Sequence, residues 1–262
     1  MSGLALALFL AGGAGTATGF ERFEPVQPGP DETVSATHCT DDRRWCAELS
    51  KDVESNRWTL AVFAGRPTAP TTPAATYPLP DEEQDADYGL WPKILRLDDP
   101  SGGLLMGVET QVNAGYSGGG GSAATLHLLH VVPVARETVS AREVWSAPLS
   151  AALQMRACFS ERDTRNRAGA CQDEYLFNAT LTPSEPSVEG LPRLTYGAVA
   201  TAYPADASRR TDSTTRPPLK PRDLKRVRDA RCSVIRVLTY APGKGAYVPD
   251  SPLPDCSDYT EP

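Results

Sequence analysis

Ser117 lies at the centre of Gly-Tyr-Ser-Gly-Gly (115–119), which matches the G-x-S-x-G pattern around the nucleophile of serine hydrolases. In those enzymes the serine follows a strand and precedes a helix, and a histidine later in the chain accepts its proton. Here four glycines follow Ser117, and each costs a helix about 1 kcal/mol relative to alanine. No histidine follows His130. We therefore predict a hairpin turn at 115–121 whose glycines adopt positive φ, and Ser117 stays a catalytic candidate only for an alternative function.

His127 and His130 could in principle bind a metal ion, but their spacing opposes it. They lie in Thr-Leu-His-Leu-Leu-His-Val-Val, a segment rich in strand-forming residues. Side chains three residues apart on a strand point to opposite faces of the sheet. The two imidazoles therefore cannot share one ion, and we interpret both as hydrogen-bonded histidines within a sheet.

An acidic run offers the other candidate metal ligands. Ca²⁺ binds six to eight oxygens, which carboxylates can supply, but the run has neither the spacing nor the glycine of an EF-hand loop. The carboxylates concerned are Asp81, Glu83, Asp85 and Asp87. We interpret them as solvated loop residues and predict neither a metal site nor a cofactor.

The charge balance narrows the class of partner. The net charge is −7 and the calculated pI about 5.1, so the protein as a whole repels nucleic-acid phosphates and that partner is excluded. One stretch, 220–231, is basic and could hold an anionic polymer or a lipid headgroup, although solvated charge is the commoner explanation. The candidates for binding a partner are Tyr116, Arg222, Lys225 and Arg226.

The cysteine content predicts disulfides. An even number of cysteines in an exported chain favours disulfide pairing, and no Cys-x-x-Cys or Cys-His spacing typical of a zinc site occurs. Each consecutive couple brackets a plausible turn, so we predict sequential pairs: Cys39–Cys46, Cys158–Cys171 and Cys232–Cys256. Closing such short loops stabilises a fold by about 2.5 to 3.5 kcal/mol each.

The N-terminus is typical of a secretory signal. Residues 3–18 are uncharged and mostly small or apolar, a run shorter than the roughly 20 residues of a membrane-spanning helix. We predict a signal peptide at 1–19, with a retained N-terminal anchor as the alternative because no Lys or Arg precedes the run. The mature chain, 20–262, is then a single domain without a transmembrane span, in the periplasm or secreted by a bacterium.

The fold class follows from alternating apolar residues and frequent Pro and Gly. Strand-like runs occur at 43–63, 93–99, 104–114, 125–134, 152–159, 174–181, 194–203 and 232–249. We predict an all-β protein, an antiparallel β-sandwich or irregular β-barrel with long loops and little helix. The Pro-rich and acidic segment 65–92 is expected to be a long loop or linker, and only 221–230 has a helical pattern.

Three hypotheses about function remain. The first is a non-enzymatic, envelope-associated binding or interaction protein, whose partner is an envelope component or a secreted protein. The second is a secreted hydrolase of cell-wall or extracellular polymer. The third is an inhibitor of a secreted enzyme such as a lysozyme or protease, which would use the turn at 115–121 because rigid β scaffolds present loops well.

Overall fold

The computed structural model describes residues 19–25, 37–52, 57–64, 75–79, 86–97, 103–135 and 138–262. All but the last residue of the predicted signal peptide therefore lie outside the described residues. Two antiparallel sheets dominate the described chain, so the predicted all-β class with little helix is confirmed, and the sheets are open rather than closed into a barrel.

The large sheet has ten strands in the order β1-β7-β8-β9-β10-β11-β12-β14-β15, with β13 beside β12. Its strands are β1 (Glu21–Arg22), β7 (Asp87–Arg96), β8 (Leu104–Tyr116), β9 (Gly119–Ala135), β10 (Thr138–Arg156), β11 (Gln172–Val188), β12 (Leu191–Tyr203), β13 (Val227–Asp229), β14 (Ile235–Ala241) and β15 (Ala246–Pro249). Most neighbours in this sheet are also neighbours in sequence, because short turns join them as hairpins.

The small sheet has five strands in the order β2-β3-β4-β5-β6. They are β2 (Glu24–Pro25), β3 (His38–Cys39), β4 (Trp45–Lys51), β5 (Trp58–Ala64) and β6 (Ala75–Pro78). Among the described residues, helix is limited to α1 (Glu161–Asn166), α2 (Ser257–Thr260) and two short 3₁₀ turns, at Ser213–Thr215 and Pro221–Asp223.

At one end of the molecule the large sheet separates into two layers. β10 pairs with β11 only over 150–156 and 172–178, so the first part of β10 stays with β9 while the rest of β11 stays with β12. Trp145 of β10 then packs against Tyr196 of β12, with ring centroids 5.2 Å apart, and Arg142 donates a hydrogen bond of 2.6 Å to the Tyr240 hydroxyl. The main apolar core lies between these layers.

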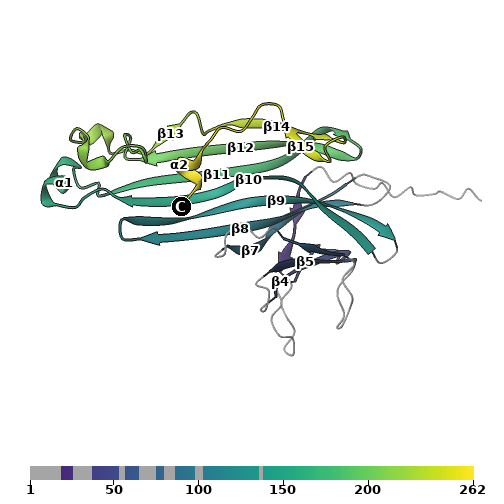
Figure 1. Ribbon diagram of the computed structural model, residues 1–262. Helices are drawn as coiled ribbons and strands as arrows, with labels where there is room; N and C mark the ends of the chain where they lie inside the picture. Colours follow the sequence, from purple (N-terminus) through teal and green to yellow (C-terminus); the bar gives the residue numbers. More distant parts are fainter. Residues whose placement is uncertain are drawn as a thin grey trace, which may run out of the picture.

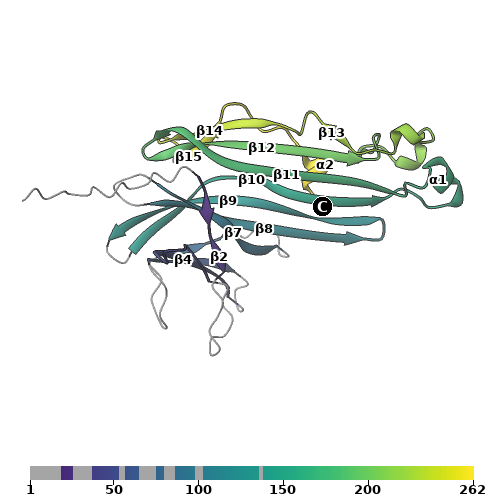
Figure 2. The same ribbon diagram turned by 180° about the vertical axis from the view of Figure 1, so that it is seen from behind.

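The small sheet covers the other side of β7–β9 at the same end (Figures 1 and 2). Leu60 and Val62 of β5 pack there with Met106 and Val108 of β8 and with Leu129 of β9. This end therefore has three β layers. The opposite end, which carries the β8–β9 turn and α1, extends beyond the small sheet and is named here the tip.

At the tip the two faces of the large sheet differ. The strand register aligns Leu153, Tyr175 and Ala202 on one face, all of them buried. The next residues along, Gln154 and Glu174, are aligned on the other face, where Gln154 is exposed. Alternation along each strand thus produces a covered apolar face and an open polar face from the same segments.

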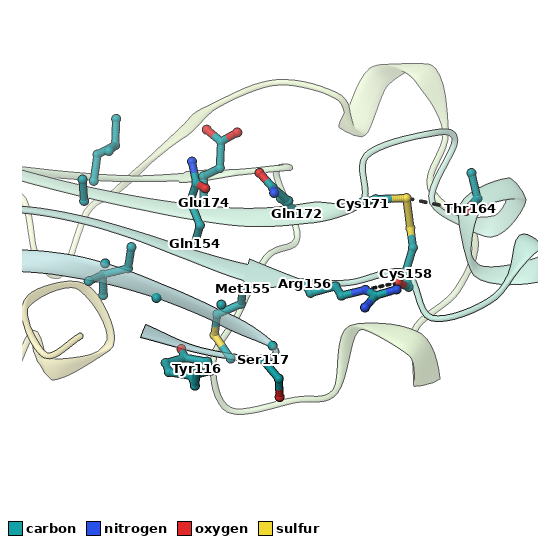
Figure 3. Close-up of a pocket in the computed structure, with 17 residues that line it drawn as sticks. Tyr116, Ser117, Gln154, Met155, Arg156, Cys158, Thr164, Cys171, Gln172 and Glu174 are labelled. Atoms are coloured by element: carbon teal, nitrogen blue, oxygen red, sulfur yellow. Dashed lines mark hydrogen bonds between the residues drawn. A yellow bond between two sulfur atoms is a disulfide. The ribbon is translucent and has the colours of Figure 1, made fainter. Parts of the chain in front are cut away.

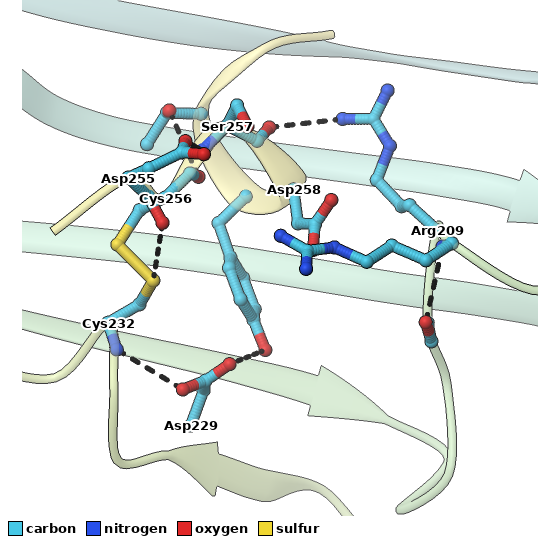
Figure 4. Close-up of polar contacts among 11 residues, drawn as sticks. Arg209, Asp229, Cys232, Asp255, Cys256, Ser257 and Asp258 are labelled. Atoms are coloured by element: carbon cyan, nitrogen blue, oxygen red, sulfur yellow. Dashed lines mark hydrogen bonds and ion pairs between the residues drawn. A yellow bond between two sulfur atoms is a disulfide. The ribbon is translucent and has the colours of Figure 1, made fainter.

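The C-terminal segment, 250–262, covers the apolar face, and we name it the C-terminal clasp (Figure 4). The Tyr259 side chain of α2 is buried against Tyr175, with ring centroids 5.8 Å apart. Its hydroxyl donates a hydrogen bond of 3.0 Å to Asp229. Arg209 donates to the Ser257 carbonyl at 3.3 Å, and Arg210 pairs with Asp258 at 3.1 Å. The segment 204–231 thus holds the clasp on the sheet through its side chains Arg209, Arg210 and Asp229.

All three predicted disulfides are confirmed. Cys39–Cys46 links neighbouring strands of the small sheet, Cys158–Cys171 closes the connection that contains α1, and Cys232–Cys256 ties the clasp to the segment before β14. Each bond therefore constrains a part of the chain outside the long hairpins, where backbone pairing gives less support.

Two local predictions are corrected. The segment 221–230 is not a helix: after the turn at Pro221–Asp223 it forms β13, because pairing with Ala200–Ala202 of β12 satisfies its backbone. The predicted loop 65–92 contains edge strand β6, which ends at Pro78, and the first six residues of β7. Proline is tolerated at such a sheet edge because no partner requires its missing N–H.

In the part of the chain that the structure describes, the helices are too short to span a bilayer.

Candidate binding site

The turn predicted at 115–121 exists, but it is tighter than expected. β8 runs to Tyr116 and β9 begins at Gly119, so Ser117 and Gly118 alone form the turn. Positive φ values occur at other glycines, namely 169, 190 and 245, which corrects the expectation that the tip glycines are needed for positive φ.

The tip glycines are instead required because three strands approach closely. A Cβ atom on Gly119 would overlap the carbonyl oxygen of Gln154 in β10. One on Gly120 would lie 2.6 Å from the Ala114 carbonyl oxygen, and one on Gly121 would lie 2.5 Å from that of Ala152. Side chains are therefore excluded from this part of β9 by backbone on both sides.

Ser117 is exposed at the turn and far from every histidine of the chain. His127 and His130 lie opposite Val108 and Leu105 in the β8–β9 pair. At about 3.3 Å per residue, the nearer imidazole is roughly 25 Å along the strand from the turn. His38 lies in the small sheet. The structure thus does not place an imidazole where it could accept the Ser117 proton.

His127 belongs to a different, buried network. Its Nε2 lies 3.3 Å from the Thr110 hydroxyl and its Nδ1 lies 3.0 Å from the Glu143 carboxylate. The order hydroxyl, imidazole, carboxylate is that of a catalytic triad. Thr110 is only 2% exposed and His127 only 3%, so no substrate reaches the hydroxyl. We interpret the network as the hydrogen bonding that a histidine inside a sheet requires, as the sequence predicts.

An open trough of about 810 Å³ lies at the tip beside the glycine segment (Figure 3). Gly118–Gly121 line one part of it, and the Cys158–Cys171 disulfide lines another. Figure 3 shows Gln154, Gln172 and Glu174 on one side of the β10–β11 ribbon and Tyr116 with Met155 on the other. We name this concavity the tip trough; backbone of the glycine segment lines it next to the polar row.

The charged groups of the trough are oriented by neighbours. The Nε of Arg156 donates a hydrogen bond of 2.8 Å to the Cys158 carbonyl, and its guanidinium lies 5.1 Å from the centre of the Phe159 ring. Among the described residues, no carboxylate pairs with this guanidinium. Glu174, by contrast, pairs with Arg226. The trough therefore presents one oriented positive charge that is not neutralised by an ion pair.

This arrangement brings together two candidates that are far apart in the sequence. Tyr116, 48% exposed, lies at the turn, and Arg226 reaches the trough through Glu174 and also lies 6.0 Å from the ring of Tyr203. Arg222 and Lys225 are exposed on the neighbouring segment. The predicted turn and the predicted basic stretch thus both lie at the tip, with Tyr116 on one side of the β10–β11 ribbon and Glu174, the partner of Arg226, on the other.

Only one of the acidic metal candidates lies among the described residues. Asp81, Glu83 and Asp85 lie outside the described residues, and Asp87 is exposed at the start of β7. Within the described ranges, no three metal-binding side chains gather in one place. Burial raises the pKa of Glu109, but Glu109 lies six residues before Gly115 in β8, about 20 Å from the trough.

Sequence reasoning did not single out Gln154, Arg156 or Gln172. A signal was present, because polar residues alternate with Leu153 and Met155 in β10, but the register with β11 cannot be derived from either strand alone.

Comparisons of the chain with protein families, with curated proteins and with solved structures found no significant match. The trough must therefore be interpreted from its own chemistry.

Proposed function

We propose that this chain is an exported bacterial protein, periplasmic or secreted, that acts by binding an envelope component or a secreted partner and not by catalysis. The observation that carries the proposal is the pairing of all six cysteines in disulfides. Such bonds persist in oxidising compartments and are reduced in the bacterial cytoplasm.

Two further observations support binding. The tip trough is an open concavity lined by amide, guanidinium and carboxylate groups, which are the groups that orient polar ligands. In addition, Ser117 lies far from the three histidines, and the Thr110 hydroxyl and His127 imidazole of the triad-like network are buried. The chemistry of the accessible site thus favours recognition over bond cleavage.

Cell fractionation of a bacterium that expresses the full chain tests export. We expect the protein in the periplasmic or secreted fraction, with the N-terminal apolar run removed and no free thiol by non-reducing mass mapping. A cytoplasmic protein with reduced thiols would contradict the proposal.

A fluorophosphonate probe tests the non-catalytic part of the proposal. We expect no labelling of the oxidised protein. Labelling that disappears in Ser117→Ala would instead establish a serine hydrolase, and Ser251→Ala, at another exposed serine, is the matched control.

Inhibition of a secreted enzyme is the second candidate, favoured by the position of the β8–β9 turn at the end of the molecule (Figures 1 and 2). Exposed Tyr116 could enter an enzyme cleft from this turn. The measurement is inhibition of a lysozyme or a protease by the wild type and by a variant with a shortened 118–121 segment. Equal inhibition by both would exclude the turn as the contact.

A further inference from the structure

The tip trough has features that select one class of ligand. It is open, its lining includes the backbone of Gly118–Gly121, and its polar side chains include two amides, one arginine and one glutamate. Apolar side chains also line it, namely Tyr116, Ala152, Leu153, Met155 and Leu176, so polar groups and apolar surface lie side by side. Sugar rings match this lining, because their hydroxyl groups exchange hydrogen bonds with amides and carboxylates and their C–H faces pack on apolar and aromatic side chains.

The charge of the trough narrows the class further. Arg156 adds a positive charge and Glu174 is already paired with Arg226, so the site is locally positive within a protein of net charge −7. One unneutralised cation suits a single carboxylate. A single positive charge is not enough to bind a nucleic acid, because that binding depends on many phosphate contacts.

No described residue forms a hydrogen bond with the outer nitrogens of Arg156, so these nitrogens are available to a ligand. Its Nε is occupied by the Cys158 carbonyl, and the Phe159 ring supports one face of the guanidinium. The N–H groups of Nη1 and Nη2 remain as donors, and their planar arrangement fits the two oxygens of a carboxylate. Because Cys158 forms a disulfide with Cys171, this orientation belongs to the oxidised protein.

We propose that the tip trough binds the carboxylate-bearing sugar units of an acidic glycan. Arg156 binds the sugar carboxylate, Gln154 and Gln172 exchange hydrogen bonds with hydroxyl groups, and Glu174 accepts from a hydroxyl while it remains paired with Arg226. The row from Gly120 through Gln154 to Glu174 crosses neighbouring strands and spans about 10 Å, so a short run of sugar rings lies across the strands. This inference deepens the proposed binding function and rests on it.

Titration of the oxidised full-length protein with pentagalacturonate tests the inference. We expect amide chemical shifts to change at Gly118–Gly121, Gln154 and Glu174, and binding to weaken as salt is added. The methyl ester of the same oligosaccharide keeps the rings but removes the charge, so it should bind at least about ten-fold more weakly. Absence of binding by pentagalacturonate, or equal binding by its ester, would overturn the inference.

A matched pair of variants assigns the contact to Arg156. Arg156→Gln is expected to raise the Kd for pentagalacturonate by about ten-fold or more, whereas Arg162→Gln, which removes the same charge from the exposed surface of α1, should leave it unchanged. An equal loss of affinity in both variants would show that general positive charge, and not a contact with Arg156, holds the oligosaccharide, and would overturn the assignment. If Arg156→Gln does not fold, the amide chemical-shift changes of the wild-type protein still show whether the oligosaccharide binds in the trough. A failure here leaves the export result untouched, so the two proposals fail separately.

Discussion

The covered and the open face of the tip come from the same strands and differ in almost every physical respect. Leu153, Tyr175 and Ala202 are buried under the C-terminal clasp, where a disulfide and a buried tyrosine hold the covering segment. One residue further on, Gln154 and Glu174 face the open trough. Buried packing is therefore concentrated on one face of the tip, and the polar side chains of the other face contribute little to the core.

Removal of the clasp disulfide is expected to have the largest effect. Cys232→Ser with Cys256→Ser opens a loop with a sequence separation of 24, which should lower the free energy of unfolding by about 3.5 kcal/mol. Urea denaturation of the variant and the wild type, both without reductant, measures the difference. A loss below about 0.5 kcal/mol would mean that the clasp does not need the bond.

Adjacent residues of β10 provide the most direct test of the two faces. Leu153→Ala should destabilise the protein by about 3 kcal/mol, because Leu153 is 3% exposed and its removal leaves a cavity. Gln154→Ala, on the open face, should change stability by less than about 0.5 kcal/mol. Thermal and urea unfolding of both variants give the comparison, and similar values for the two would contradict the assignment of the faces.

Glycine substitutions test the close approach of the strands at the tip. Gly119→Ala should cost about 2 kcal/mol, because its Cβ would overlap the Gln154 carbonyl and β9 would have to shift. Gly115 has no atom within 4 Å of the corresponding position, so Gly115→Ala is the matched control and should be nearly neutral. Chemical denaturation distinguishes the two variants, and an equal cost at both positions would point to a general loss of flexibility instead.

Tyr259→Phe is expected to have the smallest effect on the covered face, about 1 kcal/mol at neutral pH, from the lost hydrogen bond to Asp229. Burial raises the pKa of Tyr259 above its usual value near 10. Above pH 10 the unfolded chain therefore releases this proton before the folded protein does, and stability falls by up to about 1.4 kcal/mol per pH unit. Stability measured between pH 8 and 11 should decline less steeply in the variant; an identical slope would contradict the burial of this hydroxyl.

Much of the fold was predictable because its signals are local. Alternation in 104–114 and 194–203 indicates strands with one buried face, and the spacing of the cysteines predicts three sequential pairs, all confirmed. The spacing of His127 and His130 also predicts their placement on opposite faces. The segment 221–230 was misinterpreted because its pairing with β12 is a long-range contact that overrides local preference.

The site could not be predicted in the same way. Glycines 118–121 indicate a turn from sequence, but only the spacing of β8, β9 and β10 shows that 119–121 lie in a strand and exclude side chains. Arg156, Glu174 and Arg226 come from three segments, and their proximity depends on the β10–β11 register and on the position of the 220–231 stretch.

The sequence by itself thus determined the strands, the hairpins and the cysteine pairs, because short-range periodicity and turn formation act between residues that are close along the chain. Only the tertiary structure decided which face the clasp covers, where the large sheet divides into layers, and which polar groups meet in the trough. Those outcomes depend on strand register and packing between distant segments, where a shift of one residue would exchange the two faces.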